Sequence, residues 1–352
     1  MLDQAAANIG IDRRSIASFL RRTIAAAEAL PRGPLHRRMA APAGIPLELW
    51  FDDASEAEVA AARLADTPVP APGSPTRIYV LSEATIGSLP EWTDVACDAA
   101  EFHAILATAG LRVAYPSRPH QWLALDLAKG VGVQLARSPT DLPPWFAGAP
   151  LRQHLHWLLR ARGWRIAHAA SLGLNGRGIL LLGHGGAGKS GTTLAGIAAG
   201  LQTVGDDYVA LSSAKPAIAR LLFRVMKQDR AGLARTAELA DRLSHLPLNW
   251  MNKVEFDPAA IFPSCFTGAL RIDAIVLPRL SHAAVPHFAA ATPGEAMRVL
   301  IPSNLFQFPG EPIDGLDDYA ALVRSVPIHG LELSDNAADN GAALAEFVAA
   351  LS

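Results

Sequence analysis

Residues 183–190 have the residue types and the spacing of a phosphate-binding loop. They read Gly-His-Gly-Gly-Ala-Gly-Lys-Ser, which fits the pattern G-x-x-x-x-G-K-S. A short apolar run, 178–182, precedes the loop, and residues 191–199 are typical of a helix start. In such a loop the backbone N–H groups and the helix N-terminus bind phosphate oxygens. The residues expected to bind the nucleotide are Gly183, Gly185, Gly186, Ala187, Gly188, Lys189, Ser190 and Gly191.

The loop alone does not distinguish a switch, a motor or a kinase, because phosphoryl transfer also needs a metal carboxylate and a group that handles the acceptor proton. The pair Asp206-Asp207 follows the loop after one predicted helix and a short predicted strand, 202–204. We expect Lys189 to reach the outer phosphates and Ser190 to ligate Mg²⁺. One carboxylate of the pair, with Asp206 as the candidate, would also hold the metal, and the other would accept a proton from an incoming hydroxyl. The sequence does not assign the base within the pair, so Asp206, Asp207 and Lys189 are all catalytic candidates.

His168 is a further catalytic candidate. It lies in a predicted strand, 164–172, that is joined to 177–182 through Asn175-Gly176, a strong hairpin signal. We therefore expect His168 on a strand neighbouring 178–182, within reach of the nucleotide. The best downstream strand, 273–280, reads Pro-Arg at its end and offers no Asp there, which disfavours the usual motor or GTPase arrangement.

Three segments together resemble a known family. His-Ala-Ala-Ser (168–171), the run from Asn175 to Ser190, and Gly-Asp-Asp-Tyr-Val-Ala-Leu (205–211) are similar to HPr kinase/phosphorylase and its shorter, HPr-kinase-like relatives. Residues 271–279 and 325–333 resemble the same group, so the resemblance covers roughly 160–335. It implies an α/β P-loop kinase domain of the type also found in phosphoenolpyruvate carboxykinase.

The resemblance also implies roles. ATP and Mg²⁺ would be the cofactors, one carboxylate of the Asp206-Asp207 pair would activate the acceptor hydroxyl, and His168 would position or polarise that pair. The relatives include kinases that phosphorylate a serine on ribosomally made precursor peptides, lasso peptide precursors among them. The bifunctional enzymes carry an acid where this chain has Gly191, and their Glu-containing signature segment is missing. Both departures argue against phosphorolysis and against HPr as the substrate.

The rest of the chain predicts two domains of an α+β protein. Prolines between Pro139 and Pro150 place the boundary, giving a mixed α+β domain over 1–148 and the kinase domain over 149–352. The first domain would position or dock the acceptor. Its predicted elements are helices over 13–30 and 53–64, strands over 44–51 and 77–81, a proline-rich loop over 67–75 and a hairpin over 121–137.

The second domain has further predicted helices over 151–162, 293–300, 316–324 and 338–351, and a strand over 327–333. Residues 216–243 are predicted to form a long, mostly helical insertion whose arginine-rich part, 220–242, is either a wall for the acceptor or a solvated helix pair. Lys253 and Arg279 are weaker candidates for contact with a transferring phosphate.

Composition limits the alternatives. The 352 residues carry a net charge of −2 and are 50% hydrophobic, which favours a folded protein and gives no general attraction to nucleic acid or membrane. Two cysteines, Cys97 and Cys265, and no apparent signal peptide or spanning segment suggest the cytoplasm. A homo-oligomer is compatible with the sequence.

The sequence therefore predicts a kinase that uses ATP and Mg²⁺ to phosphorylate a serine of a peptide or protein. A small-molecule hydroxyl kinase with the same site is the alternative enzyme. A nucleotide-binding sensor is the alternative from another class of protein. Such a module needs the phosphate-binding loop, but it has no need of a base for an acceptor hydroxyl.

Overall fold

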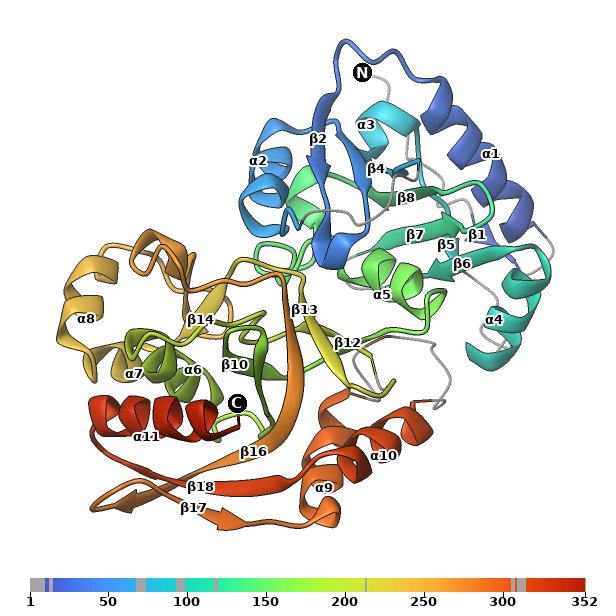
Figure 1. Ribbon diagram of the computed structural model, residues 1–352. Coiled ribbons are helices and arrows are strands. Elements are labelled where there is room, and N and C mark those ends of the chain that lie inside the picture. Colours follow the sequence, from blue (N-terminus) through green and yellow to red (C-terminus); the bar gives the residue numbers. More distant parts are fainter. Residues whose placement is uncertain are drawn as a thin grey trace.

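The computed structural model describes residues 10–12, 15–67, 74–92, 99–116, 120–212, 214–304, 308 and 315–351 (Figure 1). The chain is a mixed α/β protein with two large sheets. The first two residues of the predicted helix 13–30, Cys97 and most of the proline-rich loop lie outside the described residues. Within the described part of the chain, no helix combines the length and the apolar character needed to cross a bilayer.

The first sheet has six strands in the order β2-β3-β4-β8-β7-β6. Strands β3, β4 and β8 are parallel to one another, and the other pairs are antiparallel. Alternating burial of Leu47, Leu49 and Phe51 explains why 47–51 is a strand with one face in the core. The bounds are β2 His36–Ala40, β3 Leu47–Phe51, β4 Thr76–Ser82, β6 Leu111–Ala114, β7 Gln121–Asp126 and β8 Val131–Ala136.

Helices cover this sheet; those at 16–29 and 54–63 correspond to the predicted helices over 13–30 and 53–64, whereas those at 83–86 and 99–108 are not among the predicted elements. In the described part of α1 (Ile16–Ala29), Ile16, Leu20 and Ile24 are buried. The carboxylate of Asp53 caps the second helix by accepting from the backbone N–H groups of Ser55 and Glu56, at 2.9 and 3.0 Å. The remaining elements of this half are β1 Gly10–Ile11, α2 Ala54–Arg63, α3 Glu83–Ile86, β5 Glu91–Trp92, α4 Ala99–Thr108 and the 3₁₀ turns Pro42–Gly44 and Pro139–Asp141.

The second sheet carries the phosphate-binding loop. Its path is β10-β11-β16-β13-β12-β9, with β18 beside β16 and β17 beside β18. The long central strand β16 is parallel to both β11 and β18. The bounds are β9 Arg165–Ala167, β10 Ala170–Leu174, β11 Arg177–Leu181, β12 Val209–Ser212, β13 Ile218–Leu221, β16 Ala269–Ala283, β17 His287–Ala290 and β18 Ile328–Ser334.

Helices α6 and α11 lie together on this half of the protein (Figure 1). Gly341 allows their close approach, because a Cβ there would lie 2.4 Å from the carbonyl oxygen of Ala195. The remaining elements are α5 Arg152–Arg160, α6 Lys189–Ala198, β14 Met226–Gln228, α7 Arg230–Ala234, α8 Ala237–Leu243, β15 Val254–Phe256, the 3₁₀ turn Pro258–Ala260, α9 Pro293–Asn304, α10 Leu316–Ser325 and α11 Ala337–Ala350.

Three predicted elements differ from the structure. Residues 216–243 are helical only from 230 onward, because 218–221 pairs between β12 and β16 and 226–228 pairs with β15. The predicted strand 202–204 consists of isolated bridges, from Gln202 to Gly173 and from Thr203 to Phe266. The predicted strand 164–172 is divided into β9 and β10 at His168. For 218–221 and 226–228, pairing with a distant segment overrides the local pattern.

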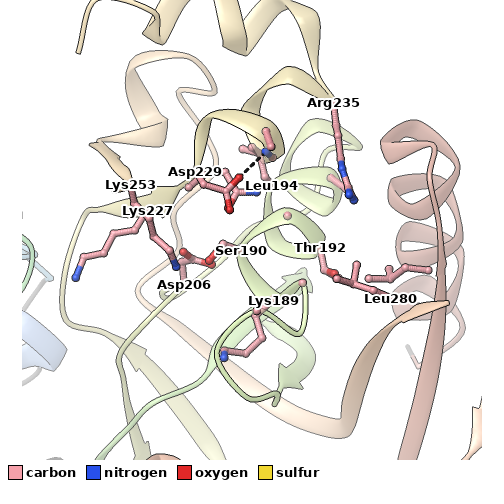
Figure 2. A pocket seen from close by; sticks show the side chains of 18 of the residues that line it. Lys189, Ser190, Thr192, Leu194, Asp206, Lys227, Asp229, Arg235, Lys253 and Leu280 are labelled. Atoms are coloured by element: carbon pink, nitrogen blue, oxygen red, sulfur yellow. Dashed lines mark hydrogen bonds between the residues drawn. The ribbon is translucent and has the colours of Figure 1, made fainter. Parts of the chain in front are cut away.

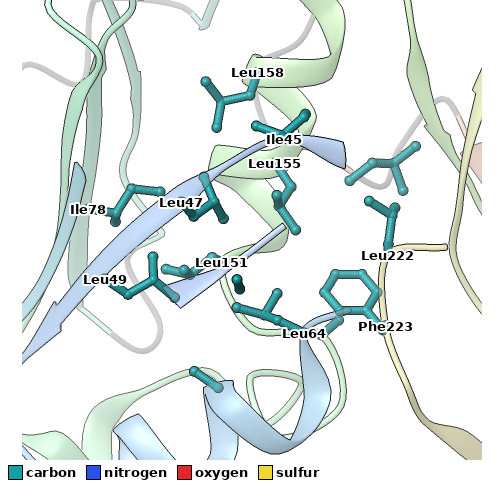
Figure 3. Close-up of a cluster of buried hydrophobic side chains, with 14 of the residues drawn as sticks. Ile45, Leu47, Leu49, Leu64, Ile78, Leu151, Leu155, Leu158, Leu222 and Phe223 are labelled. Carbon is teal, nitrogen blue, oxygen red and sulfur yellow. The ribbon is translucent and has the colours of Figure 1, made fainter. Parts of the chain in front are cut away.

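The two sheets share a hydrophobic cluster (Figure 3). Leu47 and Leu49 of β3 contribute from one side, Leu155 of α5 lies between, and Leu222 and Phe223 contribute from the other. Backbone hydrogen bonds join the same segments: the N–H of Ala65 donates to the carbonyl of Leu222 at 3.0 Å, and that of Arg224 donates to Arg63 at 2.7 Å. The cluster fixes how the first sheet sits on the second.

Truncating this cluster should destabilise the whole chain. Phe223 is 3% exposed, and we expect Phe223→Ala to lower the free energy of unfolding by roughly 3–5 kcal/mol, measured by urea denaturation. Val285→Ala, at an exposed turn, is the control and should change it by less than about 0.5 kcal/mol. A Phe223→Ala loss as small as that of the control would contradict the shared core.

Candidate active site

The phosphate-binding loop joins the end of β11 to the start of α6, as predicted. Gly186 and Gly188 adopt φ values of +82° and +93°, where a residue with a side chain is strained. A Cβ at Gly185 or Gly186 would meet nothing within 4 Å. Gly183 and Ala187 lie in the base of the loop, where a Cβ on Gly183 would be 2.8 Å from that of Ala187. The loop therefore presents bare backbone to the space beside it.

Lys189, the first residue of α6, folds back into this loop. Its Nζ donates to the carbonyl oxygens of Gly183 at 2.5 Å and His184 at 3.4 Å. Burial lowers the pKa of Lys189, while the charges of Asp206 and Asp207 oppose that shift. A buried ammonium held at the mouth of an anion-binding loop favours a negatively charged ligand there.

Asp206 is a buried carboxylate without a hydrogen-bond partner. It is 3% exposed, and neither of its oxygens has a partner among the described residues. Burial, with the nearby charge of Asp207, raises the pKa of Asp206 to about 6. The Ser190 hydroxyl and the backbone of Lys227 oppose this rise, although neither is in hydrogen-bonding geometry. Figure 2 shows the Asp206 carboxylate beside Ser190, facing the cleft.

These two side chains fit a hard divalent cation. Mg²⁺ takes oxygen ligands and is usually bound by one or two protein groups together with substrate phosphates. A cation here would satisfy the unpartnered carboxylate of Asp206, and Ser190 would add a hydroxyl oxygen. No group of three or more His, Cys, Asp or Glu side chains gathers as a metal site among the described residues.

Asp207 is held by two cationic or hydrogen-bonding partners. Its Oδ1 is 2.8 Å from Nε2 of His168, and its Oδ2 is 3.1 Å from Nζ of Lys227. Burial alone would raise the pKa of Asp207, but the hydrogen bond from His168 and the charge of Lys227 outweigh it and hold the pKa well below its usual range. Asp207 is therefore an anion in the folded protein at neutral pH.

His168 reaches this pair by a different route from the predicted one. It lies between β9 and β10, and not on the hairpin strand beside 178–182. Ala167 of β9 pairs with Val209 of β12, which begins just after Asp207, so the antiparallel register brings His168 to the acidic pair. The backbone N–H of His168 donates to Oδ1 of Asn304, the last residue of α9, at 2.6 Å. His168 therefore lies beside the acidic pair, but the pairing of β9 with β12 brings it there, and not the predicted hairpin.

Lys227 is the principal site residue that sequence reasoning did not single out. It appears in the sequence only as one basic residue of the insertion 216–243. In the structure β14 pairs Lys227 with Glu255 of β15, and its Nζ lies 3.9 Å from Oε1 of Glu255. Gly148 packs against it, since a Cβ there would be 2.6 Å from Cε of Lys227. No local pattern signals a residue whose position depends on a distant strand and on a glycine from the other half.

All these groups face one cleft of about 310 Å³. The phosphate loop and the Asp pair form its floor, α7 and the segment before β15 form one wall, and the ends of β16 and β18 with the start of α11 form the other (Figure 2). Gly191 lines the cleft, while Gly183 and Ala187 do not. Arg279 pairs with Glu295 and Glu332 outside it. Among the lining residues are His168, Gly185, Gly186, Gly188, Lys189, Ser190, Asp206, Asp207, Lys227, Asp229, Arg235, Met251, Lys253, Leu280, Leu333, Asp335 and Asn340.

Comparison with known proteins adds little to this geometry. No protein-family model matches the chain, and no curated protein matches its sequence. One solved structure that it matches is the HPr(Ser) kinase/phosphatase from Coxiella burnetii, at 14% sequence identity over 53% of this chain and 88% of that chain, with a TM-score of 0.29. A TM-score of that size carries no structural argument, so function has to be argued from the site of this chain.

The buried Asp206 predicts a pH effect on stability in the metal-free protein. Its pKa rises from 3.8 to about 6 on folding, so the folded state retains the proton over a range where the unfolded state has lost it. Stability from this group is present below pH 4 and is lost as the pH rises through about 6, a change of roughly 3 kcal/mol. The free energy of unfolding, measured by urea denaturation in EDTA, should therefore become larger for Asp206→Asn relative to the wild type as the pH rises over that range. Parallel pH curves for the two proteins would contradict the burial of an unpartnered carboxylate.

Proposed function

We propose that the protein is a kinase that uses ATP and Mg²⁺ to phosphorylate a serine hydroxyl of a peptide or protein. One observation supports this above all others. A single cleft contains both the phosphate-binding residues, Lys189 and Ser190, and an anionic carboxylate, Asp207, held by His168 and Lys227. A nucleotide-binding sensor has no use for the second group, whereas phosphoryl transfer needs it.

The proposed step is a direct transfer. The serine oxygen forms a bond to the γ-phosphorus, the bond from that phosphorus to the β,γ-bridging oxygen breaks, and ADP leaves with the electron pair. The hydroxyl proton passes to a carboxylate of the Asp206-Asp207 pair. Mg²⁺ held by Ser190 and Asp206 would neutralise charge on the phosphate oxygens. Lys189 and the backbone N–H groups of the loop stabilise the same charge.

Asp207 is the better proton acceptor of the pair in this scheme. Asp206 is the residue free to bind the cation, because its oxygens have no other partner among the described residues. The pKa of Asp207 is low, which makes it a weak base. That suffices where the transition state is loose and the hydroxyl loses its proton late, since orienting the hydroxyl then matters more than base strength. His168 and Lys227 fix the carboxylate in that orientation.

The acceptor class rests on the motif resemblance of residues 168–211, which points to serine in ribosomally made precursor peptides, including lasso peptide precursors. A small-molecule hydroxyl would be transferred by the same groups and is the alternative. The first half of the chain packs Gly148 against Lys227, so it contributes to the site as well as to the fold.

Removing the carboxylate or the loop lysine should abolish transfer. We expect Asp207→Asn to slow single-turnover transfer of ³²P from γ-labelled ATP to a serine peptide by about 10²–10⁴-fold, because the acceptor loses its oriented base. Lys189→Ala should be equally inactive, because the outer phosphates lose their ammonium. Asp317→Asn and Lys129→Ala change exposed residues of the same types and are the controls. Transfer by Asp207→Asn at the control rate would refute the mechanism.

Removing Lys227 should change the pH profile of transfer. Without the ammonium the pKa of Asp207 rises, so the carboxylate becomes protonated at a higher pH. We expect Lys227→Met to shift the acid limb of the single-turnover rate toward higher pH and to lower the rate by about tenfold or more at neutral pH. Lys227→Arg retains the charge, so both the shift of the acid limb and the loss of rate should be smaller than in Lys227→Met. A neutral-pH rate and an acid limb that are both unchanged in Lys227→Met would contradict the role of Lys227 in holding the Asp207 carboxylate.

A further inference from the structure

The turn 248–251 exposes an unusual amount of apolar surface beside the cleft. Leu248 is 47% exposed, Trp250 58% and Met251 48%, which makes them three of the few large hydrophobic side chains on the surface of the described residues. Single exposed apolar residues are ordinary, whereas large exposed apolar patches mark interaction sites. The three come from four consecutive positions, and Met251 among them also lines the cleft.

The turn is held in a fixed shape. Oδ1 of Asn249 accepts from the backbone N–H groups of Met251 at 2.9 Å and Lys253 at 3.0 Å. The N–H of Asn249 in turn donates to the carbonyl of Lys253 at 2.7 Å. Asn252 adopts a φ of +57°, which closes the turn. Trp250 and Met251 are thus displayed on a rigid support, which reduces the conformational entropy lost on binding.

The same turn is connected to the catalytic carboxylate. Nδ2 of Asn249 donates to Oε1 of Glu255 at 2.7 Å, and Glu255 lies beside Lys227, which binds Asp207. Met251 and Lys253 line the cleft. Lys253 also contributes, through its charge, to the lowering of the pKa of Lys189, the residue expected to reach the outer phosphates.

The opposite end of the cleft suits the nucleoside better. There Leu280 and Leu333 lie against Gly188, and Asp335 and Asn340 line the wall with them. Apolar side chains beside polar ones are typical of a site for a base and its sugar. The turn 248–251 is on the side of Asp207 and Lys227, where the acceptor hydroxyl has to enter.

We propose that the turn 248–251 binds an apolar side chain of the acceptor, a few residues away from the serine that is phosphorylated. This inference rests on the proposed function and adds a specificity determinant to it. An extended chain spans about 3.3 Å per residue, so a flanking side chain can reach the turn while the serine lies at Asp207. Trp250 supplies most of the contact area, since a tryptophan offers a large, rigid apolar surface.

The test uses short Ala/Gly peptides with one central serine. One peptide has no apolar side chain, and each of the others carries phenylalanine at one flanking position. We expect phenylalanine at one position to lower the KM for the peptide by about tenfold with the wild-type protein. Trp250→Ser and Met251→Ser should remove that preference while the KM for ATP stays the same. Met39→Ser is matched to Met251→Ser, because Met39 is 52% exposed on β2 of the other sheet, and it should retain the preference.

The outcomes separate this inference from the proposed function. Transfer to serine peptides with the same phenylalanine preference in Trp250→Ser would overturn the inference and leave the kinase assignment intact. A raised KM for ATP in Trp250→Ser would show that the turn binds the nucleotide base and would also overturn it. If the wild type transfers phosphate to none of the peptides, both this inference and the proposed function are wrong.

Discussion

The site depends on the charge of Asp207, which is the point where distant parts of the chain meet. His168, between two strands of the second sheet, donates to one oxygen, and Lys227, from a separate two-stranded ribbon, donates to the other. The Asp207 side chain is 27% exposed, so its two partners act mainly by fixing its position and keeping its pKa low. Loss of either partner would affect both the position of the carboxylate and its pKa.

Different elements around this ion pair have different roles. The β11–loop–α6 unit presents the glycine-rich loop and Lys189 to the cleft, and β9 and β12 bring His168 and the Asp pair alongside it. The first sheet contributes indirectly. It shares the hydrophobic cluster around Phe223, and its connection to α5 places Gly148 against Lys227. The two halves therefore build one cleft, and stability and activity should respond together to changes in the shared core.

The sequence predicts the local features well, because the loop and the Asn175-Gly176 hairpin are each set by residues close in the chain. It fails where pairing is non-local. Residues 218–221 and 226–228 are strands because β12, β15 and β16 offer them partners, although their composition resembles the helical stretch that follows. For the same reason the sequence gives no sign of Lys227 as a partner of Asp207. The route that brings His168 to the pair is likewise visible only in the register of β9 with β12.

The most direct test of this account is a crystal structure with Mg²⁺ and a non-hydrolysable ATP analogue. The account predicts that the γ-phosphate lies beside Ser190 and Lys189, with the metal on Asp206 and with Asp207 facing the side from which an acceptor would approach. The Asp207 contacts to His168 and Lys227 would persist. A triphosphate whose γ-phosphate points toward Leu280 and away from Asp207, or a metal bound without Asp206, would contradict the assignment of this cleft to phosphoryl transfer.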